Sequence, residues 1–228
     1  MEAQSNTRIL KGTCNLCGKI FKKAAMTNHL KSCREKNPPK APGKEKPCKE
    51  KVFYLLVEGR DLLDYWMHVE APADSVLSQL DDLLRRTWLE CCNHISAFTI
   101  DKERYSVEPL AELEEKDMYI SLGDVLRPRM RFYHVYDYGT TTKLTLKVVS
   151  VRERLISNEP PQILARNEPP EIVCDSCGKL ATHVCSCWHW GGEGWLCDAC
   201  VTKHGCEYGM LLPVVNSPRV GICGYDGK

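Results

Sequence analysis

Four closely spaced pairs of cysteine and histidine residues lie between positions 174 and 206, and they constrain this chain more than any other feature. Two such side chains one or two residues apart can hold one tetrahedral metal ion from a tight turn, and zinc sites are built from these pairs. Because the spacers are short, we expect a cross-braced arrangement of two closed sites, first pair with third and second with fourth. The expected ligands are Cys174, Cys177, Cys197 and Cys200 for one zinc, and Cys185, Cys187, His204 and Cys206 for the other.

These ions are expected to be structural. A closed site with four protein ligands lacks the open position that a catalytic zinc keeps for water. His183 and His189 compete with His204 for its ligand position because they lie in the same stretch. The cysteines are grouped in pairs instead of being scattered as in a disulfide framework, and the chain has no apolar N-terminal segment. We therefore expect a reducing, cytoplasmic location and no membrane attachment.

A similar motif near the N-terminus predicts a third zinc, which makes three per chain. Its ligands would be Cys14, Cys17, His29 and Cys33. Thr27 is the expected N-cap of a helix over residues 28–34, which places His29 and Cys33 on one helix face. A finger spanning residues 8–36 is too small to fold on its apolar core alone. Its metal would contribute on the order of 10 kcal/mol of binding free energy to folding.

The spacing of this finger, with its closing His-Leu-Lys-Ser-Cys, resembles the ubiquitin-binding zinc fingers of the DNA-repair ligase type. Members of that family carry an acidic residue after the leucine to contact their partner, whereas this chain has Lys31. The substitution adds to a basic surface. The residues of that surface are Lys19, Lys22, Lys23, Lys31 and Arg34.

The charge of the chain is unevenly distributed. The net charge is only +1, but residues 1–51 carry 13 lysines and arginines against 4 glutamates. A basic segment joined to an acidic body is typical of a protein that contacts a polyanion at one end. We expect the finger to contact nucleic acid or a ribonucleoprotein through phosphates, since one finger provides little base-specific recognition. The alternative is a solvated, partly disordered tail.

Residues 52–157 have the pattern of a folded α+β domain. The periodicity predicts a hairpin over 52–58 and 62–69, followed by an amphipathic helix over 75–90. Further strands are expected at 96–101, 104–107, 130–137 and 143–152. The order of hairpin, helix and further strands suggests a β-grasp-like domain. We therefore predict an α+β fold in which this central domain is flanked by the N-terminal C2HC zinc finger and a C-terminal two-zinc module.

Segments of this domain resemble the uncharacterised Ri-plasmid third-open-reading-frame-like family, whose relatives include insertion-element passenger proteins. The resemblance covers residues 52–155. The matching segments are 53–57, Ala-Pro-Ala-Asp at 71–74, and Phe-Tyr-His-Val-Tyr-Asp-Tyr-Gly at 132–139. Family members often continue with an acidic residue and a tryptophan, where this chain has Thr140 and Thr142. The resemblance implies a fold and no established reaction.

The remaining segments read as linkers and a partner-binding end. Residues 37–51 form a basic linker rich in proline and lysine, and residues 158–171 form a proline-rich linker. The two-zinc module covers 172–228, and its apolar tail over 211–225 is expected to dock on its own chain or on a partner. Expected partner-binding residues are Trp188, Trp190, Trp195 and Arg219. Cys91 and Cys92, being adjacent, are interpreted as small buried residues at a helix end.

The sequence contains no phosphate-binding glycine loop, nucleophile elbow or HExxH motif. We therefore expect a non-enzymatic, zinc-stabilised binding protein that contacts nucleic acid or a ribonucleoprotein through its finger, with no small-molecule substrate. One alternative is a protein–protein adaptor that docks through the C-terminal module and tail. The other is an enzyme with its site in the cleft of the central domain.

Overall fold

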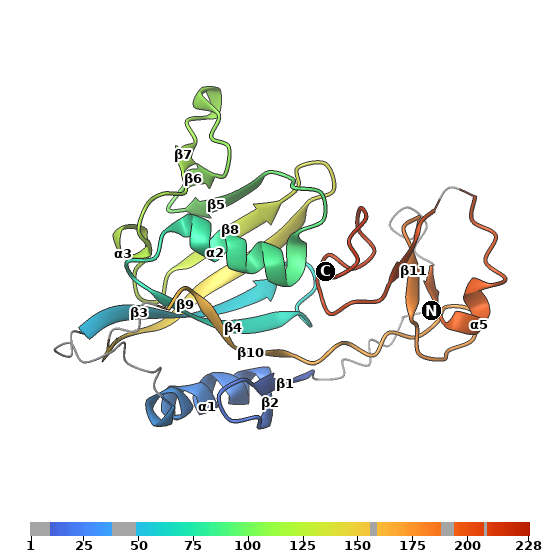
Figure 1. Ribbon diagram of the computed structural model, residues 1–228, viewed down its shortest axis with the longest axis horizontal. Helices are drawn as coiled ribbons and strands as arrows, with labels where there is room; N and C mark the ends of the chain where they lie inside the picture. The colour runs from blue at the N-terminus through green and yellow to red at the C-terminus, as the bar shows by residue number, and fades with distance from the viewer. Residues whose placement is uncertain (1–9, 38–48, 156–158, 188–193, 208) are drawn as a thin grey trace, which may run out of the picture.

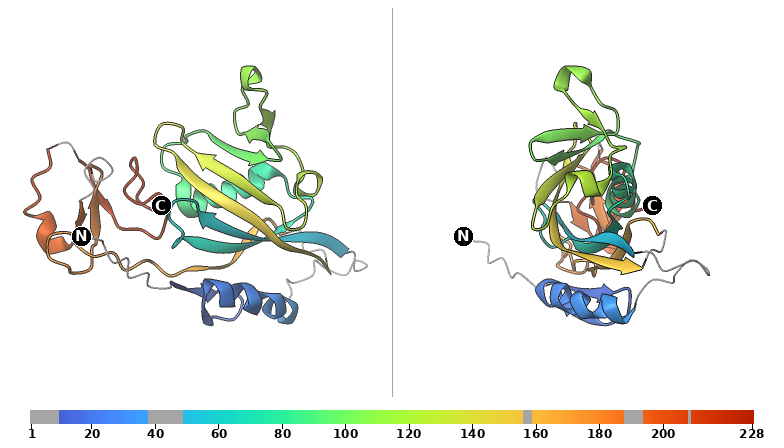
Figure 2. Two further views of the ribbon diagram at one scale, coloured as in Figure 1. Left: turned by 180° about the vertical axis from the view of Figure 1, so that it is seen from behind. Right: turned by 90° about the vertical axis from the view of Figure 1, so that its left-hand side faces the viewer.

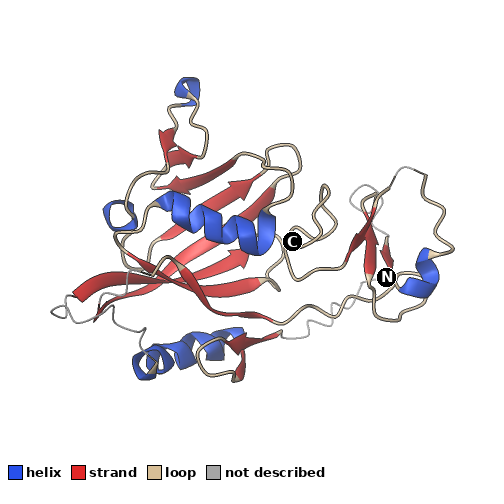
Figure 3. Cartoon of the chain, viewed as in Figure 1, coloured by secondary structure: helices blue, strands red, loops and turns tan. Residues whose placement is uncertain are grey.

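The computed structural model describes residues 10–37, 49–155, 159–187, 194–207 and 209–228. The fold is mixed α+β and is dominated by one large sheet with few helices (Figures 1 and 3). Within the described residues this sheet has ten strands in the order β2-β1-β10-β4-β3-β9-β8-β5-β6-β7. Its strands are β1 (Lys11–Cys14), β2 (Ile20–Lys22), β3 (Lys49–Gly59), β4 (Trp66–Pro72), β5 (Ser96–Ile100), β6 (Glu103–Ser106), β7 (Lys116–Asp117), β8 (Arg131–Tyr136), β9 (Thr142–Leu155) and β10 (Gln162–Asn167).

The other elements are short. A second sheet, in the order β12-β11-β13, forms part of the C-terminal region. It contains β11 (His183–Cys185), β12 (Trp195–Leu196) and β13 (Leu211–Pro213). The helices are α1 (Lys23–Lys36), α2 (Leu77–Leu84), α3 (Leu122–Val125) and α5 (Asp198–Val201), with a π-helical turn η1 (Arg85–Leu89) and a 3-10 turn η2 (Ala111–Leu113). None of the helices in the described ranges is long and apolar enough to cross a membrane.

The central strand β3 is buried on both faces, which explains its nearly continuous apolar sequence. Successive side chains of a strand point to opposite faces of the sheet. Phe53 and Val57 belong to the main core, on the face covered by α2. Tyr54 and Leu56 belong to a second cluster on the other face, beneath α1. The sheet is thus the middle layer between α2 and the N-terminal finger (Figure 2).

The helix after the first hairpin changes type before it ends. Leu77, Leu80 and Leu84 recur at helical spacing and are buried against the sheet, as the periodicity predicted. The α-helical part stops at Leu84, and η1 continues the chain with π-helical bonding to Leu89. The expected helix over 75–90 is therefore one α-helix followed by a wider turn that places the next residues toward the C-terminal tail.

Two local expectations were wrong at their boundaries. The second strand starts at Trp66 instead of 62, because the turn after β3 is longer and is closed by the Tyr65 N–H donating to the Leu62 carbonyl. The finger helix α1 starts at Lys23, so Thr27 lies inside the helix. Its hydroxyl donates to the Lys23 carbonyl at 3.2 Å and does not cap the N-terminus.

The segment 158–171, expected to be a linker, contains a strand of the main sheet. β10 is hydrogen-bonded to β4 on one side and to β1 on the other. Its two prolines on each side lie outside the strand, where the missing N–H groups cost no ladder bond. The finger therefore extends the central sheet through the β1–β10 pair.

The C-terminal tail docks on its own chain. The Ser217 hydroxyl donates to the Trp88 carbonyl at 2.6 Å, and Val220 is buried in the main core. Asn216 exchanges hydrogen bonds with Asn167 of β10. The apolar character of this segment is explained by these contacts with the central sheet, without a partner.

Candidate metal centres

The finger brings together the four side chains expected to share an ion. The ligand atoms of Cys14, Cys17, His29 and Cys33 all lie within 4.8 Å of one another. Cys14 and Cys17 lie on the turn between β1 and β2, which the Gly18 N–H closes by donating to the Cys14 carbonyl at 2.8 Å. His29 and Cys33 lie one turn apart on α1, as the spacing predicted.

The distances within this group fit a tetrahedral ion. With metal–sulfur bonds of about 2.3 Å, a tetrahedral ion sets neighbouring sulfurs about 3.8 Å apart, and a sulfur and a ring nitrogen about 3.5 Å apart. The sulfurs of Cys14 and Cys33 are 3.9 Å apart, and Cys17 Sγ lies 3.3 Å from His29 Nε2. Burial, together with the neighbouring Cys17 and Cys14 thiols, raises the pKa of the Cys33 thiol to about 12. A bound cation would remove this penalty because it stabilises the thiolates.

The first C-terminal group also has the expected members. The sulfurs of Cys174, Cys177, Cys197 and Cys200 lie within 4.8 Å of one another, so the first and third pairs are adjacent in space. Cys177 Sγ and Cys197 Sγ are 3.5 Å apart. Hydrogen bonds between the crowded thiols of Cys177, Cys197 and Cys174 and the Cys200 thiol raise the pKa of Cys200 to about 12. Crowding of this kind is relieved when a metal ion replaces the protons.

The second C-terminal group contains three cysteines of the four expected ligands. Cys185, Cys187 and Cys206 lie together, and the sulfurs of Cys187 and Cys206 are 3.5 Å apart. A Cβ on Gly209 would clash with the Cys185 sulfur and lie within 3.0 Å of the other two, so only glycine lets the backbone approach this closely.

His204 is not part of this second group in the described residues, and its Nε2 is buried without a hydrogen-bond partner. His183 lies on β11 and its Nδ1 contacts the Thr182 hydroxyl at 3.0 Å. His189 lies outside the described residues. The prediction of His204 as the fourth ligand is therefore not supported by the geometry, because the turn after α5 directs its ring away from the three sulfurs.

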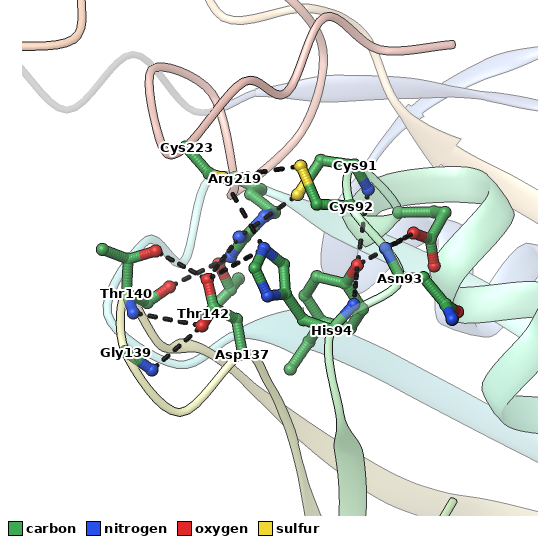
Figure 4. Close-up of polar contacts among 12 residues, drawn as sticks. Cys91, Cys92, Asn93, His94, Asp137, Gly139, Thr140, Thr142, Arg219 and Cys223 are labelled. Carbon is green, nitrogen blue, oxygen red and sulfur yellow. Dashed lines mark hydrogen bonds and ion pairs between the residues drawn. The ribbon is translucent and has the colours of Figure 1, made fainter.

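A fourth group, which the sequence interpretation missed, consists of Cys91, Cys92, His94 and Cys223 (Figure 4). Cys92 is exposed and Cys91 is half-buried, so the interpretation of both as small buried residues was wrong. Every cysteine that the structure describes belongs to one of the four groups. Four groups of side chains could hold metal ions, and their thiolate and imidazole donors are of the kind that zinc prefers.

The five expected nucleic-acid-binding residues do not share one environment. Lys19, Lys22 and Lys31 are exposed. Lys23 forms an ion pair with Glu58 at 2.6 Å. Arg34 is only 4% exposed, lies over the Tyr54 ring at 4.1 Å and is 3.8 Å from the Glu70 carboxylate, so its prediction as a phosphate-binding residue was wrong.

The expected partner-binding residues are also separated. Trp188 and Trp190 lie outside the described residues. Trp195 is half-buried and lines a cavity of about 460 Å³ between the β3–β4 turn and the tail. Arg219 is fully buried and pairs with Asp137 at 2.7 Å, so the prediction that it binds a partner was wrong. The tail folds back and encloses its guanidinium group.

No protein-family model matches the sequence, and no curated protein matches it. Among solved structures, the chain is similar to the crystal structure of a protein of unknown function from Methanosarcina mazei Go1. The match has 16% sequence identity and a TM-score of 0.47, and it covers 59% of this chain and 78% of that chain.

Proposed function

We propose that this chain is a non-enzymatic, zinc-stabilised protein that binds nucleic acid, alone or within a ribonucleoprotein, through the lysines of its finger. One observation carries the proposal. Lys11 of β1 lies directly opposite Lys22 of β2 in the antiparallel ladder, and both side chains are exposed. Like charges directly opposite each other destabilise a sheet. A polyanion bound at this position would remove the repulsion and gain two phosphate contacts.

The surrounding charges support this proposal. We define the finger lysines as Lys11, Lys19, Lys22 and Lys31. Within the described residues no acidic side chain forms an ion pair with any of them, whereas Lys23 and Arg34 are paired. Free lysines on a metal-stabilised element suit contact with phosphates, because such contact needs charge and an accessible surface and no precise base geometry.

A second basic position lies on the same sheet face as the finger. Arg131 of β8 and Lys147 of β9 are directly opposite each other and exposed. Lys147 also lies opposite Leu56 of β3, which packs beneath the finger. Next to them on β8, Tyr133 is 37% exposed. An aromatic ring between cations on an open sheet suits stacking with an unpaired base, so a single-stranded ligand fits this face best.

The salt dependence of binding tests the proposal. Binding of the full chain to a fluorescein-labelled single-stranded RNA of mixed sequence is measured between 50 and 200 mM salt, on the order of the range where such slopes are defined. Lys11→Gln combined with Lys22→Gln should weaken binding and reduce the slope of log K against log salt by roughly 1.4, at about 0.7 per lost phosphate contact. The matched control, Lys179→Gln with Lys203→Gln on the C-terminal region, should leave both quantities unchanged. Equal slopes for the two double variants would contradict the proposal.

The cavity beside Trp195 favours a second candidate function, a protein adaptor. Apolar side chains dominate its lining, including Leu62, Tyr65, Val220 and Ile222. Such a cavity suits an apolar side chain of a partner peptide. A partner bound here would be released by Trp195→Ala and would be insensitive to the finger lysines, so the same binding assay with both variants separates the two functions.

A buried polar triad in the central region does not support the enzyme alternative. The Ser96 hydroxyl donates to Asp81 at 2.9 Å, and His134 Nε2 lies 2.6 Å from the other oxygen of Asp81. In a hydrolytic triad the histidine must lie between the serine and the acid so that it can accept the serine proton. Here the aspartate lies between them, an order that suits a structural network.

Three finer expectations belong to the same proposal. The zinc identity of the bound ions follows from the donor types. The β-grasp-like description of residues 52–157 is supported by the hairpin β3–β4 that precedes α2. The relationship to the Ri-plasmid family rests on the three segments quoted above, and the cytoplasmic location rests on the pairing of the cysteines.

A further inference from the structure

The group formed by Cys91, Cys92, His94 and Cys223 has the dimensions of a metal site. All four ligand atoms lie within 4.8 Å of one another. Cys92 Sγ and Cys223 Sγ are 3.8 Å apart, and Cys223 Sγ lies 3.6 Å from His94 Nε2. These values match the edges of about 3.8 Å for two sulfurs and about 3.5 Å for sulfur and nitrogen around a tetrahedral zinc ion.

The backbone around the group is arranged to bring adjacent residues to one point. Cys91 and Cys92 follow η1 directly, and the Tyr136 hydroxyl accepts hydrogen bonds from the N–H groups of Cys91 at 3.3 Å and His94 at 3.2 Å. Asn93 and Cys223 both have positive φ angles, of 55° and 54°. A left-handed backbone costs a cysteine free energy, and such positions are concentrated at functional sites.

The charges next to the group suit an anionic metal centre. A zinc ion with three thiolates and one neutral imidazole carries a net charge of −1. The Arg219 guanidinium lies beside it and donates to Cys91 Sγ at 3.4 Å. The same guanidinium is held by Asp137 at 2.7 Å and by the Thr142 hydroxyl at 3.0 Å, so its position is fixed. Thiolate ligands of metals are commonly oriented by donors of this kind.

We propose that Cys91, Cys92, His94 and Cys223 bind a zinc ion that fastens the C-terminal tail to the end of η1. Three ligands lie between β5 and η1, and the fourth lies on the tail, more than a hundred residues later. Metal binding exchanges the thiol protons for one ion, and the ion closes a loop between residues 94 and 223. The tail thereby covers Arg219 and seals the end of the main core.

Metal content of the full-length protein tests this proposal. Zinc is measured by mass spectrometry of the purified protein, for the wild type and for Cys92→Ser with Cys223→Ser. The double variant should contain one zinc equivalent less than the wild type. The matched control is Cys48→Ser, which removes a cysteine outside the described residues and should leave the zinc content unchanged. Equal zinc content in the wild type and the double variant would overturn the proposal.

A second measurement guards against a variant that does not fold and against a disulfide. Cys92 is exposed, so Cys92→Ser alone changes no buried contact, and its cadmium-loaded form should lack one cadmium-113 resonance while the others persist. Hydrogen exchange of residues 219–225 should become faster in this variant. Alkylation and peptide mapping of the wild type should find Cys92 and Cys223 unlinked; a disulfide between them would overturn the proposal.

Discussion

Asp137 and Arg219 form a buried ion pair that joins the β8–β9 hairpin to the C-terminal tail. Arg219 Nη2 donates to Asp137 Oδ2 at 2.7 Å, and the Arg219 side chain has no exposed surface. The Tyr136 ring lies beneath the guanidinium at 4.8 Å. A conformation in which the tail is released would expose or strand this charge, so the pair determines where the tail lies.

Truncation of this pair should destabilise the fold strongly. Arg219→Ala leaves the Asp137 carboxylate buried without its cation, which costs on the order of 3–5 kcal/mol. Urea unfolding, followed by far-UV circular dichroism, should show a lower midpoint with an unchanged slope. The matched control is Arg127→Ala, which removes an exposed pair with Asp101 and should leave the midpoint unchanged. A loss no greater than that of the control would contradict a buried, structural pair.

Acid should weaken the fold through His68. Burial, helped by the nearby charges of Arg34 and Lys23, lowers the pKa of His68 to about 3. In the unfolded chain the pKa of this histidine is about 6.5, so below that pH the unfolded state binds a proton that the folded state excludes. The free energy of unfolding therefore falls by about 1.4 kcal/mol per pH unit as the pH drops from 6.5 toward 3.

The comparison that isolates this effect is wild type against His68→Gln, each unfolded with urea at pH 7.5, 6.0 and 5.5. Loss of metal at lower pH is common to both proteins and cancels in the difference. The stability of the wild type should fall more steeply than that of the variant below pH 6.5. Parallel curves would show that His68 is protonated in the folded protein.

Gly12 should tolerate no side chain. It lies on β1 between β2 and β10, and a Cβ at this position would meet both the Arg166 carbonyl oxygen and the Trp66 ring. Gly12→Ala must push the finger away from the sheet, at a cost of about 1–3 kcal/mol. Gly205→Ala is the matched control because nothing lies within 4 Å of its added Cβ. Equal urea midpoints for the two variants would show that β1 is not held against β10.

Removal of metal from the finger should expose Trp66. This side chain is 1% exposed and packs with Met26 and Leu30 beneath α1. Since the finger has little core of its own, Cys17→Ser should unfold residues 10–37 while the central strands persist. The tryptophan emission of Cys17→Ser should shift to longer wavelength relative to the wild type. The same change made in a Trp66→Phe background should give a much smaller shift, and an equal shift would place the effect elsewhere.

Local patterns in the sequence predicted the elements that local forces determine. The leucines of α2 and the strands around Phe98, Phe132 and Leu146 lie where their periodicity placed them, because one apolar face per element must meet the core. The finger ligands and the all-cysteine C-terminal group were likewise predicted from spacing, because each pair lies within one turn of the chain.

Long-range pairing produced the errors. Arg34 reads as a surface cation, and only the tertiary contact with Glu70 and Tyr54 shows that it is buried. Strand β10 lies between two proline pairs that suggest a spacer, and its sequence gives no sign that β1 and β4 are its neighbours. His94 and Cys223 are 129 residues apart, so no spacing rule would group them. A Cys-Cys-x-His sequence directly after a helix was the one local signal that could have indicated that site.

The position of β1 beside β10 also affects how the protein is made. Gly12 pairs with Asn167, and the side chains of Thr13 and Glu168 meet across a sequence separation of 155 residues. During translation the amino-terminal finger emerges from the ribosome long before the strand that it must join. It can bind its ion early, but its seat on the nascent sheet is completed only after the whole central region has been synthesised.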